Sequence, residues 1–368
     1  MREGDIMKIL FASGNLCNGG AQRVISIVSS YLAEKGYDVH LLLFSRNEKE
    51  YPISEKVKIT SIGNNYEEYS KISLMERIRF IRKLLKKLKP DIGIGFLEGG
   101  YALQLASCGI KYKRVASARI NPQYILSSKS FRGRINRMWF GGADKIVLQT
   151  KSQFKMVPET WKERSCIIAN PVSELALNNK CELYEKNCRR FIMVGRLEQQ
   201  KNYPMAFKAI EIVKEKYPDV HLDVFGKGAL EGSLQQMIDQ KGLADQITMR
   251  GWTQNALEEY TKHDLFLMTS DYEGMPNALM EAMAVGLPCV STDCETGPSD
   301  LINDGENGYL VPVNDAEKLA QRILDIIEMP MDDRIKMANL AHITMRDHFN
   351  VDVICKQWET MISDLMKE

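Results

Sequence analysis

The sequence predicts two doubly wound α/β domains, each a parallel sheet with helices on both faces. Short apolar segments alternate with amphipathic ones along most of the chain, which is the pattern of such sheets. The chain has 368 residues, whereas a single hydrophobic core stops growing at about 250–300 residues. The polar stretch Val172–Cys188 interrupts the alternation, so we expect domains at residues 1–172 and 173–349. A closing helix at about 350–368 is expected to pack back onto the first domain.

The strands expected in the first domain are apolar runs bounded by polar or turn residues. They are Met7–Ser13, Val39–Phe44, Val57–Ile62, Asp91–Leu97, Arg114–Ala118, Lys145–Thr150 and Cys166–Ala169. The loop Gly14–Gly20 joins the first strand to an amphipathic helix, Ala21–Lys35. Because ligands of such sheets bind at the carboxyl ends of strands, Gly19 and Gly20 are candidates for close contact with a phosphate or an acceptor, although a Gly-Gly pair is as often a plain turn. The loop lacks the G-x-G-x-x-G pattern, which argues against a dinucleotide-dependent oxidoreductase.

The second domain repeats the alternation of strands and helices. Its expected strands are Arg190–Gly195, Val220–Phe225, Ile247–Arg250, Leu265–Ser270, Cys289–Thr292 and Tyr309–Pro312. Helical runs at 314–327, 331–346 and 350–367 then close the chain.

The composition is that of a soluble globular protein, with 44% hydrophobic and 26% charged residues. No apolar run reaches the roughly 18 residues of a membrane-spanning helix, and the first residues do not resemble a signal peptide. The 8 cysteines are scattered without a C-x-x-C pair. We therefore expect free thiols in a reducing, cytoplasmic compartment and no metal site.

Opposite charges divide the chain. Residues 1–170 carry 29 Lys and Arg against 15 Asp and Glu, a net charge of +14, and residues 171–368 carry 20 against 33, a net charge of −13. Basic charge gathers in a predicted helix at 71–89 and in the segment 129–140, which mixes cations with aromatic residues. Both segments suit contact with an anionic membrane or a phosphorylated acceptor, but an ordinary solvated helix face fits 71–89 equally well, and docking of the two halves fits the charge division. No nucleic-acid-binding motif accompanies the charge, so we expect no nucleic acid partner.

The stretch Glu273–Pro288 is the densest group of candidate site residues. It follows a predicted strand; Gly274 breaks the chain and Pro276 suits the first turn of a helix. Glu273 is therefore expected before the helix and Glu281 within it. The helix N-terminus between them suits a phosphate, and the two carboxylates suit hydroxyls on either side of it, as in a nucleotide-sugar. Spacing alone would leave the two glutamates as ordinary surface groups.

Two cations follow another strand of the second domain. Arg196 and Lys201 lie in the loop after Phe191–Val194, at the carboxyl end where ligands bind. A guanidinium binds phosphate through two hydrogen bonds and an ammonium adds a point charge, so together they can neutralise a diphosphate without a metal. Gly226 and the pair Trp252-Thr253 follow the next two strands, where backbone contacts to a nucleobase are expected.

Three motifs resemble those of the family 4 retaining glycosyltransferases: Val194-Gly-Arg-Leu-x-x-x-Lys-Asn202, the pair Glu273 and Glu281, and Thr296–Pro312. The resemblance extends over essentially the whole chain, and it is to bacterial lipid-linked oligosaccharide and polysaccharide glycosyltransferases. It implies the GT-B fold, in which two Rossmann-like domains face across a cleft and the second holds most of the nucleotide-sugar. It also implies transfer of a hexose or N-acetylhexosamine from a UDP-sugar with retention, without a metal or other cofactor.

The resemblance assigns roles to individual residues. Arg196 and Lys201 would hold the donor diphosphate, Glu281 the ribose hydroxyls and Glu273 a hydroxyl of the transferred sugar, which makes Glu273, Arg196 and Lys201 the expected catalytic group. The remaining donor contacts expected are Gly19, Gly20, Gly195, Gly226, Trp252, Thr253, Gly274, Met275, Pro276, Asn277, Ala278 and Leu279.

The first domain departs from the family in one respect. Many members have an active-site histidine there, whereas His40 is the only histidine before residue 221 and lies inside a predicted strand. At the strand end in question this chain has Arg119 and Asn121, which we carry over with Glu98 as contacts to the acceptor or the sugar.

The expected acceptor is a glycan, either linked to polyprenyl diphosphate at the cytoplasmic face of the membrane or soluble. A nucleotide-sugar epimerase or hydrolase of the same fold and a non-catalytic nucleotide-sugar-binding protein are the alternatives. Incubation with the donor alone separates the first from a transferase. The presence of all four charged residues argues against a non-catalytic binding protein; they are Arg196, Lys201, Glu273 and Glu281.

Overall fold

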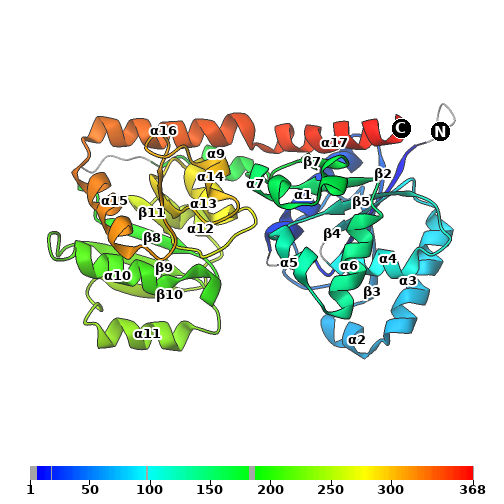
Figure 1. Ribbon diagram of the computed structural model, residues 1–368, viewed down its shortest axis with the longest axis horizontal. Helices are drawn as coiled ribbons and strands as arrows, with labels where there is room; N and C mark the ends of the chain where they lie inside the picture. The colour runs from blue at the N-terminus through cyan, green and yellow to red at the C-terminus, as the bar shows by residue number, and fades with distance from the viewer. Residues whose placement is uncertain (1–5, 18, 97, 182–186, 368) are drawn as a thin grey trace. The chain divides into compact units, whose positions relative to one another are not determined.

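A computed structural model of the chain describes residues 6–17, 19–96, 98–181 and 187–367 (Figure 1). The chain forms two compact units: unit 1 is Met1–Pro171 together with Val351–Glu368, and unit 2 is Val172–Asn350. Each unit contains one fully parallel sheet. The predicted class of two doubly wound α/β domains is therefore confirmed.

Unit 1 contains a sheet with the strand order β3-β2-β1-β4-β5-β6-β7. Its strands are β1 (Lys8–Ser13), β2 (Asp38–Ser45), β3 (Lys58–Gly63), β4 (Ile92–Phe96), β5 (Lys113–Ser117), β6 (Lys145–Leu148) and β7 (Ser165–Ile167). The central strands β1 and β4 are buried along almost their whole length, because helices cover both faces of the sheet. The order reverses between β1 and β4, which is the point where ligands bind in doubly wound sheets.

The helices of unit 1 are α1 (Gly20–Glu34), α2 (Tyr66–Lys71), α3 (Leu74–Leu88), α4 (Glu98–Ala106), α5 (Pro122–Ser127), α6 (Phe131–Gly141), α7 (Lys151–Met156), α8 (Glu159–Lys162) and α17 (Val351–Lys367). The single helix predicted at 71–89 is wrong in its start, because α2 ends at Lys71 and α3 begins only after Ser73. The Ser73 side chain accepts from the backbone of Glu76 while the Glu76 carboxylate accepts from the backbone of Ser73, which makes a capping box.

The closing helix α17 packs within unit 1, against α1. The Trp358 indole is fully buried and stacks on Phe96 of β4, with ring centroids 5.9 Å apart. On the other side, the hydroxyls of Tyr31 and Tyr37 each donate to the Glu359 carboxylate at 3.4 Å. The last helix thus completes the core of the unit that begins the chain.

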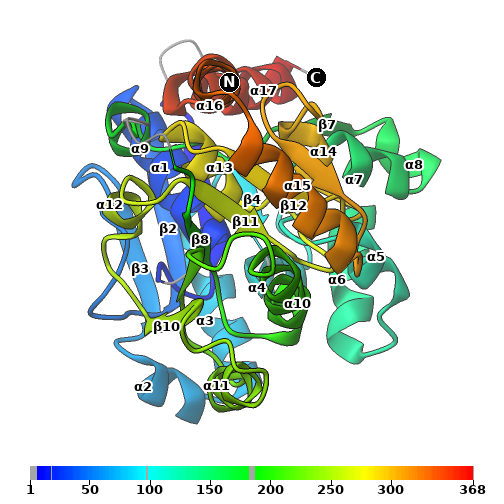
Figure 2. The same cartoon turned by 90° about the vertical axis from the view of Figure 1, so that its left-hand side faces the viewer.

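Unit 2 repeats the order of the first six strands of unit 1, as β10-β9-β8-β11-β12-β13, so its order reverses between β8 and β11. Its strands are β8 (Arg190–Val194), β9 (His221–Phe225), β10 (Ile247–Gly251), β11 (Leu265–Met268), β12 (Cys289–Thr292) and β13 (Tyr309–Val311). Its helices are α9 (Glu174–Asn178), the 3₁₀ turn Gln199–Lys201, α10 (Tyr203–Val213), α11 (Glu231–Gln240), α12 (Ala256–Tyr260), α13 (Asn277–Ala284), α14 (Pro298–Leu301), α15 (Ala316–Glu328) and α16 (Met331–His348). Helices α10 and α15 lie side by side over the sheet (Figure 2).

The stretch Val172–Cys188, expected to be irregular, contains the short helix α9, which begins at a Ser173 side-chain cap. Residues 182–186 of this stretch lie outside the described residues.

Candidate active site

Two loops meet where the strand order of unit 2 reverses. One follows β8 and runs through residues 195–202; the other follows β11 and runs through residues 269–276. Because β8 and β11 are neighbouring parallel strands, their carboxyl ends lie at the same edge of the sheet. The sequence-predicted residues Arg196, Lys201 and Glu273 are all in these two loops.

Lys201 and Glu273 are brought into direct contact. The Lys201 Nζ lies 2.6 Å from the Glu273 Oε1, and the two side chains are only 16% and 10% exposed. The Ser270 hydroxyl donates to the same Oε1 at 2.7 Å. Removing two charges from water is costly unless they are paired and hydrogen-bonded, and both conditions are met here. An ammonium and a carboxylate are thus held within one hydrogen bond of each other at the ligand-binding edge.

Backbone and side-chain hydrogen bonds join the two loops around this pair. The Asp271 amide donates to the Gln200 carbonyl at 2.8 Å, and the Gln200 side chain donates to the Tyr272 carbonyl at 2.7 Å. The Thr269 hydroxyl donates to the Lys201 carbonyl at 2.8 Å. The residue after Lys201 fixes the end of the loop: Asn202 adopts a left-handed conformation (φ 44°), which asparagine tolerates, and donates to the Asp271 carboxylate at 2.7 Å. The position of the Lys201 backbone is therefore set by the neighbouring loop.

Arg196 differs from Lys201 in its surroundings. Its side chain is 66% exposed, and its NH1 lies 2.9 Å from the Glu198 carboxylate. Exposed ion pairs contribute about 0–1 kcal/mol, so the guanidinium can exchange this partner at little cost. Lys201 is held in place, whereas Arg196 lies at the surface.

Glycines let the loop after β8 pack closely on its neighbours. Gly226 has a φ of +156°, and a Cβ built there would lie 1.8 Å from the Gly195 carbonyl oxygen. The Tyr203 hydroxyl donates to the same carbonyl at 3.1 Å. Gly226 is therefore required by backbone packing. Gly195 borders the lysine, because a Cβ there would lie 3.2 Å from the Lys201 Cε.

The turn between Glu273 and α13 is supported from a third loop. Thr296 donates its hydroxyl hydrogen to the Glu273 carbonyl. A Cβ on Gly297, whose φ is +101°, would lie 2.6 Å from the Pro276 Cδ. Helix α13 begins at Asn277, one residue later than expected, because Pro276 is its N-cap; that cap provides no side-chain hydrogen bond. The site therefore has an α-helix N-terminus next to the Lys201–Glu273 pair.

The remaining predicted donor residues have different exposures. Glu281 lies on α13 and is half-buried, and Gly274, Asn277 and Ala278 are also half-buried. Leu279 is fully buried in the core, as are most of Met275 and Pro276, so the side chain of Leu279 is a packing group and only its backbone is available to a ligand. Trp252 is 51% exposed just after β10, and Thr253 beside it is half-buried.

Unit 1 has its own candidate residues where its strand order reverses. Gly19 is the N-cap of α1, with an extended backbone (φ −162°) that any residue can adopt, and Gly20 is the first residue of the helix. Glu98, the first residue of α4, lies beside the same loop, because a Cβ on Gly14 would lie 3.6 Å from its Oε2. The Glu98 carboxylate pairs with the Arg132 NH2 at 2.8 Å.

Arg119 is enclosed in unit 1. Its Nε donates to the Ser117 hydroxyl at 2.8 Å and its NH1 to the Asn170 side chain at 2.9 Å. The guanidinium lies over the rings of Phe96 and Trp358, at 5.0 and 5.6 Å. Burial lowers the pKa of Arg119 to about 9. The side chain carried over as an acceptor or sugar contact is thus a buried, stacked cation, and Asn121 next to it caps α5 by accepting from the Gln123 amide at 2.9 Å.

Two family comparisons cover most of the chain. Residues 180–342 match the family Glycosyl transferases group 1, and residues 16–146 match Glycosyl transferase 4-like. The chain belongs to the family 4 glycosyltransferases. Its fold is GT-B, and its activity is glycosyl transfer.

Relatives and solved structures match this glycosyltransferase along its length. The amylovoran biosynthesis glycosyltransferase AmsD of Erwinia amylovora is 27% identical, over 97% of this chain and 99% of its own. A Campylobacter jejuni N-acetylgalactosaminyltransferase, whose name describes an undecaprenol-diphosphate-linked acceptor, is 28% identical over 98% and 99%. Among solved structures, Anabaena HepE in complex with UDP aligns with a TM-score of 0.79 at 17% identity, over 97% of this chain and 100% of its own. The structural likeness shows the fold alone.

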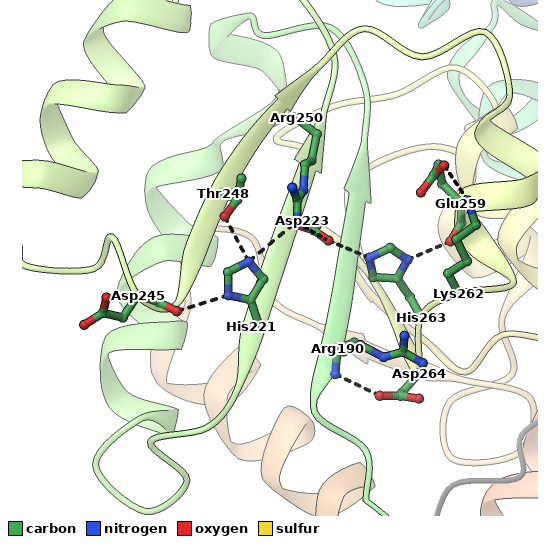
Figure 3. Close-up of polar contacts among 10 residues, drawn as sticks. All are labelled: Arg190, His221, Asp223, Asp245, Thr248, Arg250, Glu259, Lys262, His263 and Asp264. Atoms are coloured by element: carbon green, nitrogen blue, oxygen red, sulfur yellow. Dashed lines mark hydrogen bonds and ion pairs between the residues drawn. The ribbon is translucent and has the colours of Figure 1, made fainter.

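A second polar cluster of the glycosyltransferase lies on the sheet of unit 2, around Asp223 in the middle of β9 (Figure 3). The Asp223 carboxylate accepts from the Arg250 Nε at 2.7 Å and from the His263 Nε2 at 3.0 Å. Burial alone would raise the pKa of Asp223, but the hydrogen bonds from His263 and Arg250 outweigh it and lower the pKa to about 2. The cluster joins β9, β10 and the segment before β11, so it stabilises the sheet of unit 2.

Sequence reasoning assigned no role to three residues that support the Lys201–Glu273 pair and its loops. Ser270, Tyr203 and Thr296 all hydrogen-bond to the loops after β8 and β11 or to their side chains. Each lies in or near a recognised motif, but a lone hydroxyl carries no signal of its own. Across the described ranges, no three His, Cys, Asp or Glu residues are placed to hold a metal ion. No described helix of the glycosyltransferase is long and apolar enough to span a bilayer.

Proposed function

We propose that this glycosyltransferase transfers a hexose or N-acetylhexosamine from a UDP-sugar, with retention and without a metal, to a glycan carried on polyprenyl diphosphate. The product would be a surface polysaccharide or glycoconjugate. The observation that carries the proposal is the Lys201–Glu273 pair next to the α13 N-terminus. A relative whose name describes an undecaprenol-linked acceptor supports the acceptor class, and one named for amylovoran biosynthesis supports the product class.

The chemistry follows from the charges of this site. Lys201 neutralises the leaving diphosphate, and the amide groups at the start of α13 add hydrogen bonds to it. Arg196, free to exchange its surface partner, joins them. Glu273 accepts a hydrogen bond from a hydroxyl of the sugar, while Glu281 binds the ribose.

In the proposed reaction, the bond between the anomeric carbon and the diphosphate oxygen breaks, and the acceptor oxygen bonds to the same face of that carbon. The acceptor proton passes to the leaving phosphate oxygen. The products are UDP and the extended glycan, so no metal or redox partner is needed for the atoms to balance.

The decisive experiment replaces each member of the pair. Lys201→Ala and Glu273→Ala are expected to abolish transfer, assayed with a panel of UDP- and GDP-sugars in the presence of a chelator. The matched controls are Lys216→Ala and Glu328→Ala, which remove an exposed ion pair of the same unit and should leave turnover unchanged. Thermal melting checks that all four variants fold. Turnover retained by Lys201→Ala or Glu273→Ala, or lost from the wild type on adding chelator, would refute the proposal.

Two further measurements address the remaining alternatives. Incubation with the UDP-sugar alone should leave the donor unchanged, whereas an epimerase or hydrolase would convert it. Proton NMR of the product should show the same anomeric configuration as the donor; the opposite configuration would exclude retention.

We also propose a location at the cytoplasmic face of the membrane, reached through unit 1. Large apolar side chains are exposed on the two basic segments: Leu74, Met75 and Phe80 on α3, and Phe131 and Met138 on α6. Apolar side chains among cations suit an anionic lipid surface. The wild type should sediment with vesicles of phosphatidylglycerol, whereas the double variant Met75→Ser/Phe131→Ser should stay in the supernatant. Equal sedimentation of both proteins would contradict this location.

A further inference from the structure

Unit 1 contains a cavity of about 350 Å³ between α2, α3 and α4. Its walls are largely apolar and include Phe44, Ile62, Tyr69, Ile78, Tyr101 and Ala102. Phe44 and Ile62 lie near the carboxyl ends of β2 and β3, so the cavity lies at the ligand-binding edge of the sheet. Phe44 and Tyr69 stack with ring centroids 5.6 Å apart, which gives it an aromatic wall. Small-molecule sites have volumes of about 300–1,000 Å³, so the cavity is large enough for part of a ligand.

Charged side chains line the same cavity. Arg132 and Glu98 pair at 2.8 Å, with side chains 54% and 40% exposed, so both reach solvent. The Arg77 guanidinium lies 3.8 Å from the centre of the Tyr69 ring and donates to the Tyr69 carbonyl at 2.8 Å. The cavity therefore combines an apolar interior with cations from α3 and α6, the two basic segments that sequence alone associated with a membrane or a phosphorylated acceptor. Both helices pack against α4, which carries Glu98.

We propose that this cavity binds the first part of an isoprenoid chain, with the adjoining diphosphate held by Arg132. The inference rests on the proposed function, because it identifies the carrier of the acceptor. An apolar chain next to an anionic group matches an apolar cavity next to an exposed cation. A sugar ring fits poorly, since its hydroxyls would lose their hydrogen bonds to water against carbon walls. The Glu98–Arg132 pair is exposed and hence weak, so a diphosphate can displace the carboxylate from Arg132.

The position of Glu98 connects the cavity to the rest of the unit. Its carboxylate lies between Arg132 and the Gly14 end of the glycine loop. A carrier chain in the cavity would thus place its diphosphate next to that loop, where the strand order of unit 1 reverses. Each methylene group removed from water strengthens binding about fourfold, so a few isoprenoid carbons suffice for a measurable preference.

The first test measures binding without any glycosyl transfer. Titration calorimetry with farnesyl diphosphate, inorganic diphosphate and farnesol should show that the wild type binds farnesyl diphosphate at least tenfold more tightly than either other probe. Ile78→Trp, which fills the cavity from a half-exposed position, should weaken the binding of farnesyl diphosphate at least tenfold and leave the affinity for inorganic diphosphate unchanged. Phe80→Trp is the matched control on the same helix, because Phe80 is exposed and does not line the cavity; in this titration, which contains no membrane, it should bind farnesyl diphosphate as the wild type does. Arg132→Gln should weaken both diphosphates.

Equal affinity of wild type and Ile78→Trp for farnesyl diphosphate, or no binding by the folded wild type, would overturn the inference. An equal loss in Ile78→Trp and Phe80→Trp would do the same, because it would place the ligand on the outer surface of α3.

The second test separates this inference from the proposed function. One glycan acceptor is supplied on polyprenyl diphosphate and the same glycan as a methyl glycoside. Ile78→Trp should raise KM at least tenfold for the polyprenyl acceptor and leave kcat/KM for the methyl glycoside unchanged. If the wild type uses both acceptors and Ile78→Trp alters neither, the cavity does not hold the chain, while the transferase assignment stands. If the wild type uses no acceptor, the proposed function fails, and the binding titration still decides the cavity.

Discussion

The two units share one strand order, yet the residues at the two points where that order reverses differ in kind. In unit 2 the ion pair there, Lys201 with Glu273, is mostly buried, and the neighbouring loop holds the backbone of Lys201. In unit 1 the pair there, Glu98 with Arg132, is largely exposed and lies beside an apolar cavity. The same sheet edge thus carries a fixed polar site in one unit and an open, partly apolar site in the other.

We propose that this difference lets one architecture serve two ligands. The sheet determines where a ligand binds, and the loops determine what it is. A donor whose diphosphate and hydroxyls are the same in every cycle suits the fixed charges of unit 2. A carrier-linked acceptor suits a site whose ion pair can open at little cost.

The largest expected effect is a loss of stability in unit 1 when the last helix of the chain is removed. Unit 2 is continuous in sequence, whereas unit 1 needs α17 from the end of the chain. That helix buries Ile354, Cys355, Trp358, Met361, Ile362 and Leu365. At about 1.5–3 kcal/mol for each large side chain, their loss is on the order of 10 kcal/mol, comparable with the whole stability of a domain.

Deleting residues 351–368 should therefore unfold unit 1 and leave unit 2 folded. Hydrogen exchange should show lost protection in β1 and β4 and retained protection in β8 and β11. Glu359→Ala, which removes only the two hydrogen bonds from Tyr31 and Tyr37, is the mild control. Equal loss of protection in both units would mean that they do not fold separately.

Glycine substitutions compare the two loops directly. Gly226→Ala forces a Cβ to within 1.8 Å of the Gly195 carbonyl at a φ of +156°, so the backbone must shift. We expect a loss of about 3 kcal/mol of stability and a large fall in kcat, because the loop carrying Lys201 moves. Gly19→Ala meets only the flexible Gln22 side chain, so stability should change by no more than about 0.5 kcal/mol. Any activity it loses then reports on ligand contact. Urea unfolding with steady-state kinetics makes the comparison, and similar destabilisation by both would contradict it.

The two units also differ in how much of each site could be predicted from the sequence. The strands were predictable because each is a local apolar run, and Arg196, Lys201, Glu273 and Glu281 were predictable because each lies in a compact motif. The contact between Lys201 and Glu273 was not, because 72 residues separate them and only the strand order brings them together. The break between α2 and α3 did have a local signal, the capping box of Ser73 and Glu76, which the helical periodicity around it obscured.

In unit 1 the decisive features are not local. The cavity needs β2, β3 and four helices, so no single segment indicates it. Arg119 looked like a ligand contact at a strand end, but Trp358 from the far end of the chain covers it. Burial of a cation by a distant aromatic residue cannot be inferred from the residues around that cation.

A matched pair of aspartates tests whether ion pairs contribute equally to the stability of the two sheets. Asp223 on β9 and Asp38 on β2 occupy corresponding strands, and each accepts from a cation of the next strand, Arg250 or Lys58, at 2.7 Å. The pKa of Asp223 is lowered from 3.8 to about 2. At 1.36 kcal/mol per unit, this difference contributes about 2 kcal/mol of stability.

Because the folded-state pKa is the lower one, the contribution of Asp223 is fully present above about pH 4 and is lost as pH falls towards 2. Asp223→Asn should therefore cost about 2 kcal/mol at pH 7, with the gap to wild type closing below about pH 4. Burial raises the pKa of Asp38, whereas the hydrogen bond from Lys58 lowers it, and the net effect is a lowering. Asp38→Asn should therefore reduce stability with the same pH dependence as Asp223→Asn, but by a smaller amount. Urea unfolding between pH 7 and 3 measures both, and a gap that widens on acidification would disprove the sign.

The smallest effect comes from single hydroxyls that hold the first loop of each unit. The Tyr203 hydroxyl donates to the Gly195 carbonyl at 3.1 Å, next to the loop that carries Lys201, and the Ser13 hydroxyl donates to the Asn15 carbonyl at 3.1 Å. Each hydrogen bond contributes about 1 kcal/mol, so Tyr203→Phe and Ser13→Ala should lower stability by similar amounts. Their kinetics should differ, because, of the two residues, Tyr203 alone holds the loop of the buried Lys201–Glu273 pair, which we propose is catalytic. Tyr203→Phe should lower kcat severalfold, whereas Ser13→Ala should act mainly on the KM of the acceptor. The same kcat in both variants would show that loop rigidity in unit 2 does not limit catalysis.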